Sequence, residues 1–137
     1  MTKDWVKDIE TMHERYNVKE KIKHLSPEML REFLKFRINF LAEEFNELGQ
    51  AVSSSPVDAE ETVDALIDLC VVAIGTLDLF NIDSHKAWQQ VYVANMNKEV
   101  GVKASRPNPF NLPDLVKPSG WTPPDHSDNH GLLKNLK

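Results

Sequence analysis

Apolar side chains recur every three or four residues in four stretches of this chain, which is the spacing of one face of an α-helix. The first stretch, residues 3–16, carries Trp5, Ile9, Met12 and Tyr16 at these positions. No stretch shows the alternation of a half-buried strand, and no segment repeats. The pattern predicts an all-α protein, most simply a helical bundle of about four helices.

The second stretch predicts a long helix followed by a turn. Ser26 and Pro27 together are typical of a helix N-terminus, and apolar positions then recur as far as Leu48. Residues 51–56 predict the turn, because they include three consecutive serines and a proline. Two helices joined by so short a turn would form an antiparallel hairpin.

A third helix is expected after this turn, with Ser55 and Asp58 as its capping pair. Apolar residues surround much of its circumference between Val63 and Leu77, so the helix needs partners on several sides. A two-helix hairpin cannot cover that surface. We therefore expect self-association to complete the bundle, as a homodimer or a homotetramer.

The fourth helical stretch ends near Lys98. Beyond Gly101 the helical period is lost, and six of the eight prolines lie from Pro107 onward. We therefore expect one all-α domain in residues 1–103, followed by an irregular proline-rich C-terminal extension in residues 104–137.

Length and composition are typical of one soluble domain, with 137 residues of which 41% are hydrophobic and 27% charged. The net charge of -5 argues against a nucleic-acid partner, since a basic face is needed to replace phosphate counterions. No apolar run has the length of a membrane span, and the N-terminus lacks the pattern of a signal peptide. Cys70 is the single cysteine, and its apolar neighbours predict a buried thiol. We expect a cytoplasmic protein.

Acidic residues dominate the centre of the chain, since residues 38–85 hold ten Asp and Glu and no Lys or Arg. Residues three or four apart share one face of a helix. Two groups have this spacing: Glu44 and Glu47 before the predicted turn, and Glu61, Asp64 and Asp68 after it. With the hairpin centred on Ser54, each member of the first group is expected to lie level with a member of the second.

The expected level pairs are Glu47 with Glu61 and Glu44 with Asp64, with Asp68 one turn further along. Two like charges at roughly 4 Å repel by about 4 kcal/mol at an effective dielectric of about 20. The cluster therefore favours a bound cation over a merely solvated acidic face. Carboxylate ligands favour Mg²⁺, with Mn²⁺ as the alternative, and magnesium in turn indicates a phosphate-bearing substrate.

The acidic groups lie within LAEEFNEL at residues 41–48 and ETVDALID at residues 61–68. These segments resemble the MazG-like group of all-α nucleoside triphosphate pyrophosphohydrolases, whose hallmark is ExxE, a spacer and ExxD. The spacer here is the 13 residues 48–60, which fits that pattern. Asn95 and Lys98 add an NxxK-like element of the kind such proteins often carry at the end of the fourth helix.

The resemblance covers roughly residues 8–103 and implies hydrolysis of a nucleoside triphosphate to the monophosphate and pyrophosphate. It implies that Mg²⁺ is bound by four carboxylates: Glu44, Glu47, Glu61 and Asp64. Glu47 is expected to orient the attacking water, and Lys98 is expected to offset charge on the leaving pyrophosphate. Which phosphorus is attacked is left open.

Further residues are expected near the substrate. His13 resembles a histidine that some related dCTP pyrophosphatases place beside the nucleotide, although a surface histidine on an amphipathic helix fits the pattern equally. Arg37 could reach a phosphate or form a pair with an acid such as Asp68, which is itself a substrate-binding candidate. Asn95 and Lys98 could bind the substrate or simply cap the fourth helix.

Other functions remain open at this point. Phosphoribosyl-ATP pyrophosphohydrolase shares the fold and chemistry by family analogy. A di-iron carboxylate bundle needs a Glu-x-x-His motif on each of two helices, and Glu10–His13 supplies only one. A non-enzymatic helical binding module would leave the acids solvated. In the C-terminal extension, Trp121 or Phe110 could form a lid over a base, or the extension could pack around a partner subunit.

Overall fold

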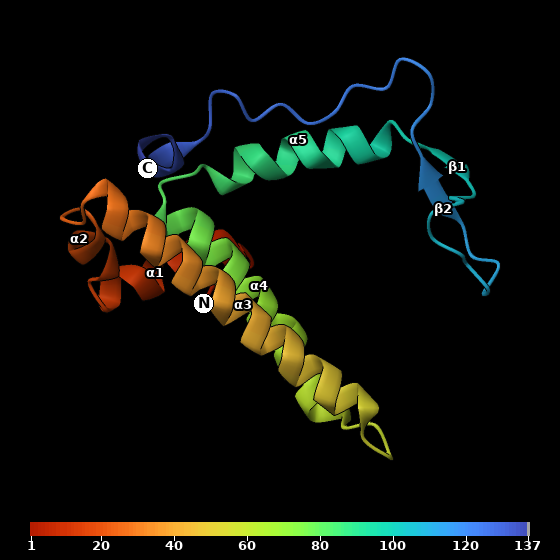
Figure 1. The fold of residues 1–137 in the computed structure, drawn as a ribbon, viewed down its shortest axis with the longest axis horizontal. Helices are drawn as coiled ribbons and strands as arrows, with labels where there is room; N and C mark the ends of the chain where they lie inside the picture. Colours follow the sequence, from red (N-terminus) through yellow and green to blue (C-terminus); the bar gives the residue numbers. More distant parts are fainter. Residues whose placement is uncertain (137) are drawn as a thin grey trace. The chain divides into compact units, whose positions relative to one another are not determined.

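The computed structural model describes residues 1–136 and is mostly helical, which confirms the all-α prediction (Figure 1). The elements are α1 (Trp5–Arg15), α2 (Val18–Ile22), α3 (Pro27–Ser53), α4 (Ala59–Leu79), α5 (Ser84–Met96), β1 (Glu99–Gly101), β2 (Asp114–Val116) and the 3-10 helix η1 (Gly131–Asn135). Two compact units are formed, one by residues 1–84 with the residues from 130 onward and one by residues 85–129. The domain boundary expected at residue 103 stays a prediction.

No single helix of residues 1–136 is long and apolar enough to cross a membrane. The consecutive helices α4 and α5 meet the length and composition criterion only when they are taken together as a broken pair.

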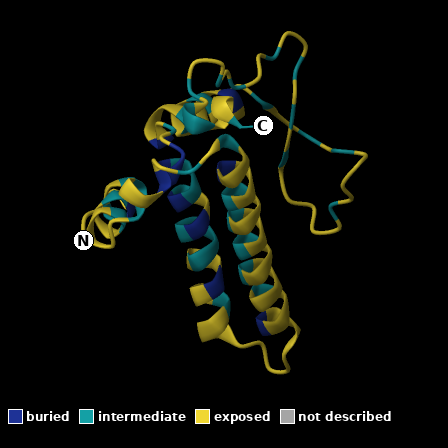
Figure 2. Ribbon diagram, turned by 60° about the vertical axis from the view of Figure 1, so that its left-hand side comes forward, coloured by how far each residue is buried: buried dark blue, intermediate teal, exposed yellow. Residues whose placement is uncertain are grey.

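The first unit is organised around α3 and α4, which lie side by side as an antiparallel hairpin (Figures 1 and 2). α3 begins where the sequence predicts. Its first helical residue is Pro27, and the Ser26 hydroxyl accepts a hydrogen bond from the main-chain N–H of Met29 at 3.2 Å. Ala51 and Ala65 are buried, and such small side chains allow two helices to pack closely.

The turn between α3 and α4 lies later than the sequence predicts, because α3 continues to Ser53. The hydroxyls of Ser53 and Ser54 donate to the carbonyl oxygens of Gly49 and Gln50, at 2.7 and 3.1 Å. A serine that bonds to the carbonyl four residues back can be accommodated at the end of a helix. The run of serines therefore does not stop the helix where a turn was expected.

Asp58, rather than Ser55, caps the N-terminus of α4. The Asp58 carboxylate accepts a hydrogen bond from the main-chain N–H of Glu61 at 3.0 Å. The N–H of Asp58 donates to the carbonyl oxygen of Ala51 at 3.1 Å, which closes the connection between the helices. A carboxylate satisfies a free donor here and also interacts favourably with the helix dipole. The predicted capping pair is therefore wrong, because Ser55 does not cap the helix and Asp58 is the N-cap rather than the residue three positions after it.

The hydrophobic core of the first unit forms where α2 and η1 meet the ends of α3 and α4, and Figure 2 shows dark blue segments there. Its buried members are Ile22, Leu30, Leu79 and Phe80. Phe80 has no exposed surface. Leu132 and Leu136 pack against this cluster from the C-terminal part of the chain.

The return of the chain to this core after residue 130 was not predicted from the sequence. The main-chain N–H of Leu132 donates to the carbonyl oxygen of Phe80 at 2.7 Å. Gly131 has a φ of 53°, and a Cβ at this position would overlap the same carbonyl oxygen. Glycine is required here by both its backbone conformation and the close approach.

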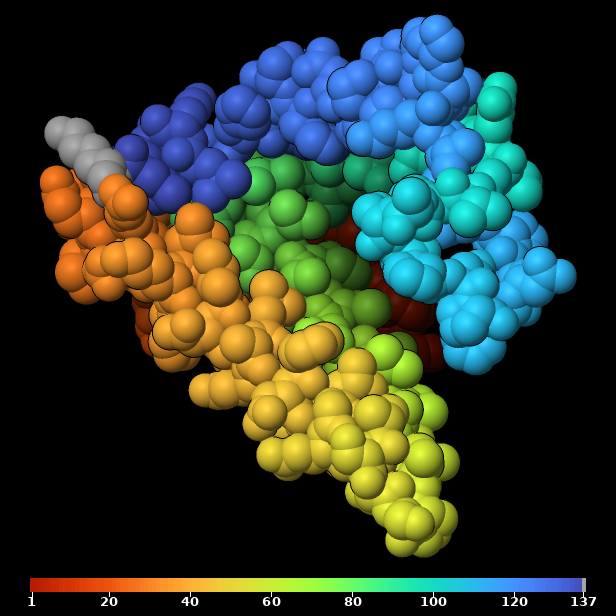
Figure 3. Space-filling model, turned by 45° about the vertical axis from the view of Figure 1, so that its right-hand side comes forward, coloured from red at the N-terminus to blue at the C-terminus, as the bar shows by residue number. Residues whose placement is uncertain are grey.

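The end of the hairpin that carries the turn is largely exposed, and Figure 3 shows it in yellow and yellow-green, projecting from the rest of the first unit. Apolar side chains are among the exposed ones. Phe45 is 68% exposed and Val63 is 63% exposed. The expected self-association, which would cover such side chains, stays a prediction.

The second unit contains α5 and the two short strands. β1 and β2 pair antiparallel, with Glu99 opposite Val116 and Gly101 opposite Asp114. A Cβ on Gly101 would lie 2.7 Å from a methyl carbon of Val116, so the strands approach closely because this residue is glycine. The strands were not predicted, since three residues are too few to show an alternating pattern. Most of the proline-rich segment has no regular structure, as expected.

Candidate functional site

The acidic face of the hairpin has a different register from the predicted one. The connection comprises residues 54–58, so the hairpin is centred on Pro56, two residues later than expected. Glu44 and Asp68 are each twelve residues from Pro56 and therefore lie level. Asp68 thus belongs to the middle of the cluster, and it takes the place opposite Glu44 that was expected for Asp64.

Glu44 is a partly buried carboxylate of this face. Its Oε2 atom is buried and has no hydrogen-bond partner among residues 1–136. Loss of solvent, followed by the negative charges of Glu47 and Asp68, raises the pKa of Glu44 above its ordinary value. The contribution of Asp68 agrees with the register centred on Pro56. An unpartnered carboxylate oxygen beside other carboxylates is the kind of group that a cation stabilises.

Glu61, on α4, is also affected by the negative charges of neighbouring carboxylates. Loss of solvent, then the charges of Asp64 and Glu47, raises its pKa. Glu47 therefore influences carboxylates on both helices, because it also raises the pKa of Glu44. None of the groups that contribute most to these two pKa shifts is a cation. The predicted acids form one connected cluster of negative charge across α3 and α4.

The side chains of this cluster do not converge on one point. Within residues 1–136, no three Asp, Glu, His or Cys side chains are placed to hold one metal ion. A shallow hollow on α4 beside the cluster is lined by Glu60, Glu61, Val63, Asp64 and Ile67. The oxygen donors and the unpartnered Oε2 of Glu44 fit a hard cation, but several carboxylates must rotate before they could share one ion.

His13 belongs to a buried ionic network rather than to the exposed acidic cluster. Its Nδ1 lies 2.6 Å from Oδ2 of Asp78, and the Lys19 ammonium lies 2.5 Å from Oδ1 of the same carboxylate. Asp78 is buried, and the His13 side chain is only 15% exposed. The alternative of a plain surface histidine is therefore wrong, while the role of His13 beside a nucleotide stays a prediction.

Asp78 was missed in the sequence analysis, although one signal was available. It is the single acid within the apolar end of α4, in the run Thr76-Leu77-Asp78-Leu79-Phe80. An acid at such a position needs a cationic partner or hydrogen bonds if it is buried. The sequence does not say which of the neighbouring helices supplies that partner.

Arg37 ties α3 to α4. Its Nε donates to the Thr76 hydroxyl and its Nη2 donates to the Val72 carbonyl oxygen, both at 3.0 Å. Burial lowers the pKa of Arg37, and the guanidinium lies 5.6 Å from the centre of the Phe40 ring. The alternative of an ion pair with Asp68 is wrong, because these polar contacts are made instead. Phosphate binding by Arg37 stays a prediction.

Gly75 is the position on α4 where the side chains of Arg37 and His13 come together. A Cβ on Gly75 would lie 2.9 Å from Nη2 of Arg37 and 3.4 Å from Cε1 of His13. The absence of a side chain at this helical position therefore allows both polar groups to approach the α4 backbone.

Asn95 and Lys98 belong to the second unit, at the end of α5. The main-chain N–H of Lys98 donates to the carbonyl oxygen of Asn95 at 3.1 Å. The Lys98 ammonium lies 5.5 Å from the centre of the Trp121 ring. The contact of Lys98 with the C-terminal extension was not predicted, and phosphate binding by either residue stays a prediction.

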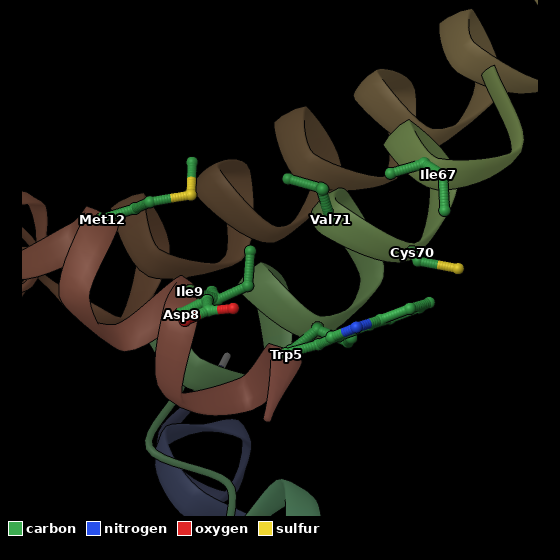
Figure 4. A pocket seen from close by; sticks show the side chains of 8 residues that line it. Trp5, Asp8, Ile9, Met12, Ile67, Cys70 and Val71 are labelled. Atoms are coloured by element: carbon green, nitrogen blue, oxygen red, sulfur yellow. The ribbon is translucent and has the colours of Figure 1, made fainter. Parts of the chain in front are cut away.

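An apolar hollow of about 190 Å³ lies between α1 and α4 (Figure 4). Trp5 and Met12 line it from α1, and Ile67 and Cys70 line it from α4. Cys70 is half-buried and forms no disulfide, so the predicted burial of its thiol is only partial. Apart from Asp8, the lining is apolar. This hollow offers few ligands for a phosphate chain.

A family model described as phosphoribosyl-ATP pyrophosphohydrolase (PRA-PH) matches residues 9–95. The chain belongs to this family, which is a member of the MazG-like all-α nucleoside triphosphate pyrophosphohydrolase superfamily. The resemblance stated from the acidic motifs is therefore confirmed, and family membership indicates pyrophosphohydrolase activity on nucleotides. A comparison with curated proteins found no matching relative.

Proposed function

We propose that the protein hydrolyses a nucleoside triphosphate to the monophosphate and pyrophosphate, with Mg²⁺ bound on the acidic face of the hairpin. The observation that carries the proposal is the buried, unpartnered Oε2 of Glu44, surrounded by other carboxylates within the segment that the family model matches. The proposal covers ribo- and deoxyribonucleotides, and Mn²⁺ is the alternative ion.

The proposed metal ligands are Glu44, Glu47, Glu61 and Asp64, and the register adds Asp68, which lies level with Glu44. Mg²⁺ held there would neutralise phosphate oxygens and make a bound water more acidic. Glu47 is proposed to orient the attacking water, because its charge acts on carboxylates of both helices. The exposed side chains of Glu47 and Glu61 can change rotamer at low cost to bring their oxygens together.

A second candidate substrate is phosphoribosyl-ATP. The observation that favours it is the description of the matching family model, which names this substrate. The same carboxylates would serve both substrates, since the bond cleaved lies in the phosphate chain in each case. Recognition of the base and sugar therefore distinguishes the two candidates.

The experiment that tests the proposal measures pyrophosphate release from a panel of ribo- and deoxyribonucleoside triphosphates and phosphoribosyl-ATP, with Mg²⁺ and with EDTA. Glu47→Gln is the test variant, because it removes one charge with little change in volume. Glu43→Gln is the matched control, because the expected motif places this neighbouring acid outside the ligand set.

The expected result is Mg²⁺-dependent release that is lost in Glu47→Gln and retained in Glu43→Gln. A preference for phosphoribosyl-ATP would favour the second candidate, and a preference for one triphosphate would favour the first. Equal activity of wild type and Glu47→Gln would contradict the assigned role of Glu47. Absence of release from every substrate would contradict the proposed function.

We also propose self-association through the exposed apolar side chains of the hairpin, which include Phe45 and Val63. Light scattering after size-exclusion chromatography should give the mass of a dimer or tetramer. A monomeric mass at micromolar concentration would contradict this proposal.

A further inference from the structure

Trp121 is fixed to the end of α5 from the C-terminal extension. Its indole Nε1–H donates to the carbonyl oxygen of Ala94 at 2.7 Å, and the side chain is partly buried. Ala94 lies in the last turn of α5, where main-chain carbonyls lack partners within the helix. The hydrogen bond thus satisfies one such carbonyl and fixes the position of the indole ring.

Two lysines from different segments lie against this one ring. The ammonium of Lys98, which follows α5, is 5.5 Å from the ring centre, and that of Lys117, which follows β2, is 4.8 Å from it. Both distances are within the range of a cation–π interaction. The ring attracts each ammonium electrostatically but cannot satisfy all three of its N–H donors.

Neither lysine is neutralised by a carboxylate. Of the residues that the structure describes, no Asp or Glu forms an ion pair with Lys98 or Lys117. Two other cations of the same unit do form ion pairs. Lys86 pairs with Asp128, and Arg106 pairs with Asp114, both at 2.6 Å.

We propose that Lys98 and Lys117 form an anion site for a chain of phosphate groups, with Trp121 as the residue that positions both lysines. Each ammonium lies within 5.5 Å of the same ring centre, and a ligand with several phosphate groups is long enough to reach both and to offset their positive charge. Lys117 is then a second phosphate ligand. The identity of the ligand as a nucleotide rests on the proposed function.

This role for Trp121 differs from a lid that stacks on a base. The ring already contacts two ammonium groups, and its N–H is engaged by Ala94. The chemistry therefore favours recognition of phosphate over recognition of an aromatic base at this position.

The test is calorimetric titration of the full-length protein with sodium tripolyphosphate in EDTA, which probes anion binding without metal or hydrolysis. Lys117→Gln is expected to weaken binding about tenfold, the loss of one charge-assisted contact. Lys103→Gln is the matched control, because it removes the same charge from the same unit but is not one of the lysines at the Trp121 ring. Equal weakening by both substitutions would overturn the site, since it would mean that only net charge matters.

Two substitutions of Trp121 distinguish a role in positioning the two lysines from a role in packing alone. Trp121→Phe and Trp121→Leu both lose the hydrogen bond to Ala94, but only phenylalanine keeps an aromatic face for the lysines. Binding is expected to be retained within about threefold in Trp121→Phe and weakened about tenfold in Trp121→Leu. Equal affinity of these two variants, with melting curves confirming that both are folded, would overturn the positioning role.

The same titrations separate this site from the proposed function. Tripolyphosphate binding that depends on Lys117, without nucleotide hydrolysis, would support the anion site and contradict the proposed reaction. Glu47-dependent hydrolysis, with tripolyphosphate binding unaffected by Lys117→Gln, would support the reaction and overturn the anion site.

Discussion

The imidazole of His13 and the carboxylate of Asp78 meet at 2.6 Å in the interior of the first unit, although 65 residues separate them along the chain. The same carboxylate contacts the Lys19 ammonium at 2.5 Å. One buried acid on α4 therefore holds side chains from α1 and α2. The contact links the N-terminal helices to the hairpin that carries the acidic cluster.

Asp78→Asn should destabilise the protein by about 2 to 4 kcal/mol, because it leaves the cationic partner of a buried acid without a counter-charge. Urea unfolding followed by circular dichroism measures the change. Glu20→Gln is the control, since Glu20 pairs with Lys23 on an exposed surface, where solvent screens the attraction between the two charges. Equal effects of the two substitutions would show that the Asp78 network does not stabilise the fold.

Gly75→Ala and Gly49→Ala should differ in sign or size, although both replace a glycine inside a long helix. Gly49 has open space around the added Cβ, so alanine there should stabilise by about 0.5 to 1 kcal/mol. At Gly75 the Cβ would displace Arg37 from its contact with the Val72 carbonyl. The lost hydrogen bond should make Gly75→Ala less stable than Gly49→Ala by about 1 to 2 kcal/mol. Identical thermal shifts would contradict this account of Gly75.

Glu44→Gln should change how stability depends on pH in the absence of metal. The folded state raises the pKa of Glu44, so it holds the proton more tightly than the unfolded state does. The protonated Glu44 therefore stabilises the folded state at pH values below the ordinary carboxyl pKa. This stabilisation is lost as the pH rises through the raised pKa of Glu44. Relative to wild type, Glu44→Gln should therefore gain stability as the pH increases from about 4 to about 8.

Melting temperatures measured in EDTA across this range test the pH dependence of Glu44→Gln. Added Mg²⁺ should raise the melting temperature of wild type and raise that of Glu44→Gln much less, because the variant lacks one proposed ligand. Glu43→Gln serves as the control in both series. A Mg²⁺ response that is unchanged in Glu44→Gln would remove Glu44 from the ligand set.

The pairing of β1 with β2 should weaken in acid. The hydrogen bond from Arg106 is the largest cause that lowers the pKa of Asp114, so this carboxylate favours the folded state when it is charged. The charged Asp114 carboxylate therefore stabilises the folded state at pH values above the ordinary carboxyl pKa. This stabilisation is lost as the pH falls through the lowered pKa of Asp114. Asp114→Asn should weaken the pairing of β1 with β2 at neutral pH, as acid does in wild type. The measurement is hydrogen exchange, and the amides of residues 99–101 should exchange faster in the variant. Exchange as slow as in wild type would contradict this role of Asp114.

Much of the helical framework could be predicted from local sequence signals. Ser26 and Pro27 marked the start of α3 correctly, because a cap and a fixed proline φ act within one turn. The end of α3 could not be predicted in the same way. Ser53 and Ser54 bond back to helical carbonyls instead of starting a turn, and the sequence alone permits both outcomes.

The acids of the candidate site were found from their spacing, but their pairing across the hairpin was not. A shift of two residues in the centre of the turn moved Asp68 into the position expected for Asp64. The network of His13 and Asp78 depends on contacts between residues far apart in sequence, which helical periodicity does not encode. The same reason applies to the contact between Trp121 and Lys98.

The packing of Leu132 and Leu136 against the Phe80 cluster has a consequence for synthesis of the chain. A ribosome makes the hairpin first and then all of residues 85–129 before these two leucines emerge. Until then, one side of the Phe80 cluster lacks its cover, and the nascent first unit exposes apolar surface that can be recognised by chaperones. Completion of the core therefore waits until Leu132 and Leu136 have been made, even though the helices at its centre are made much earlier.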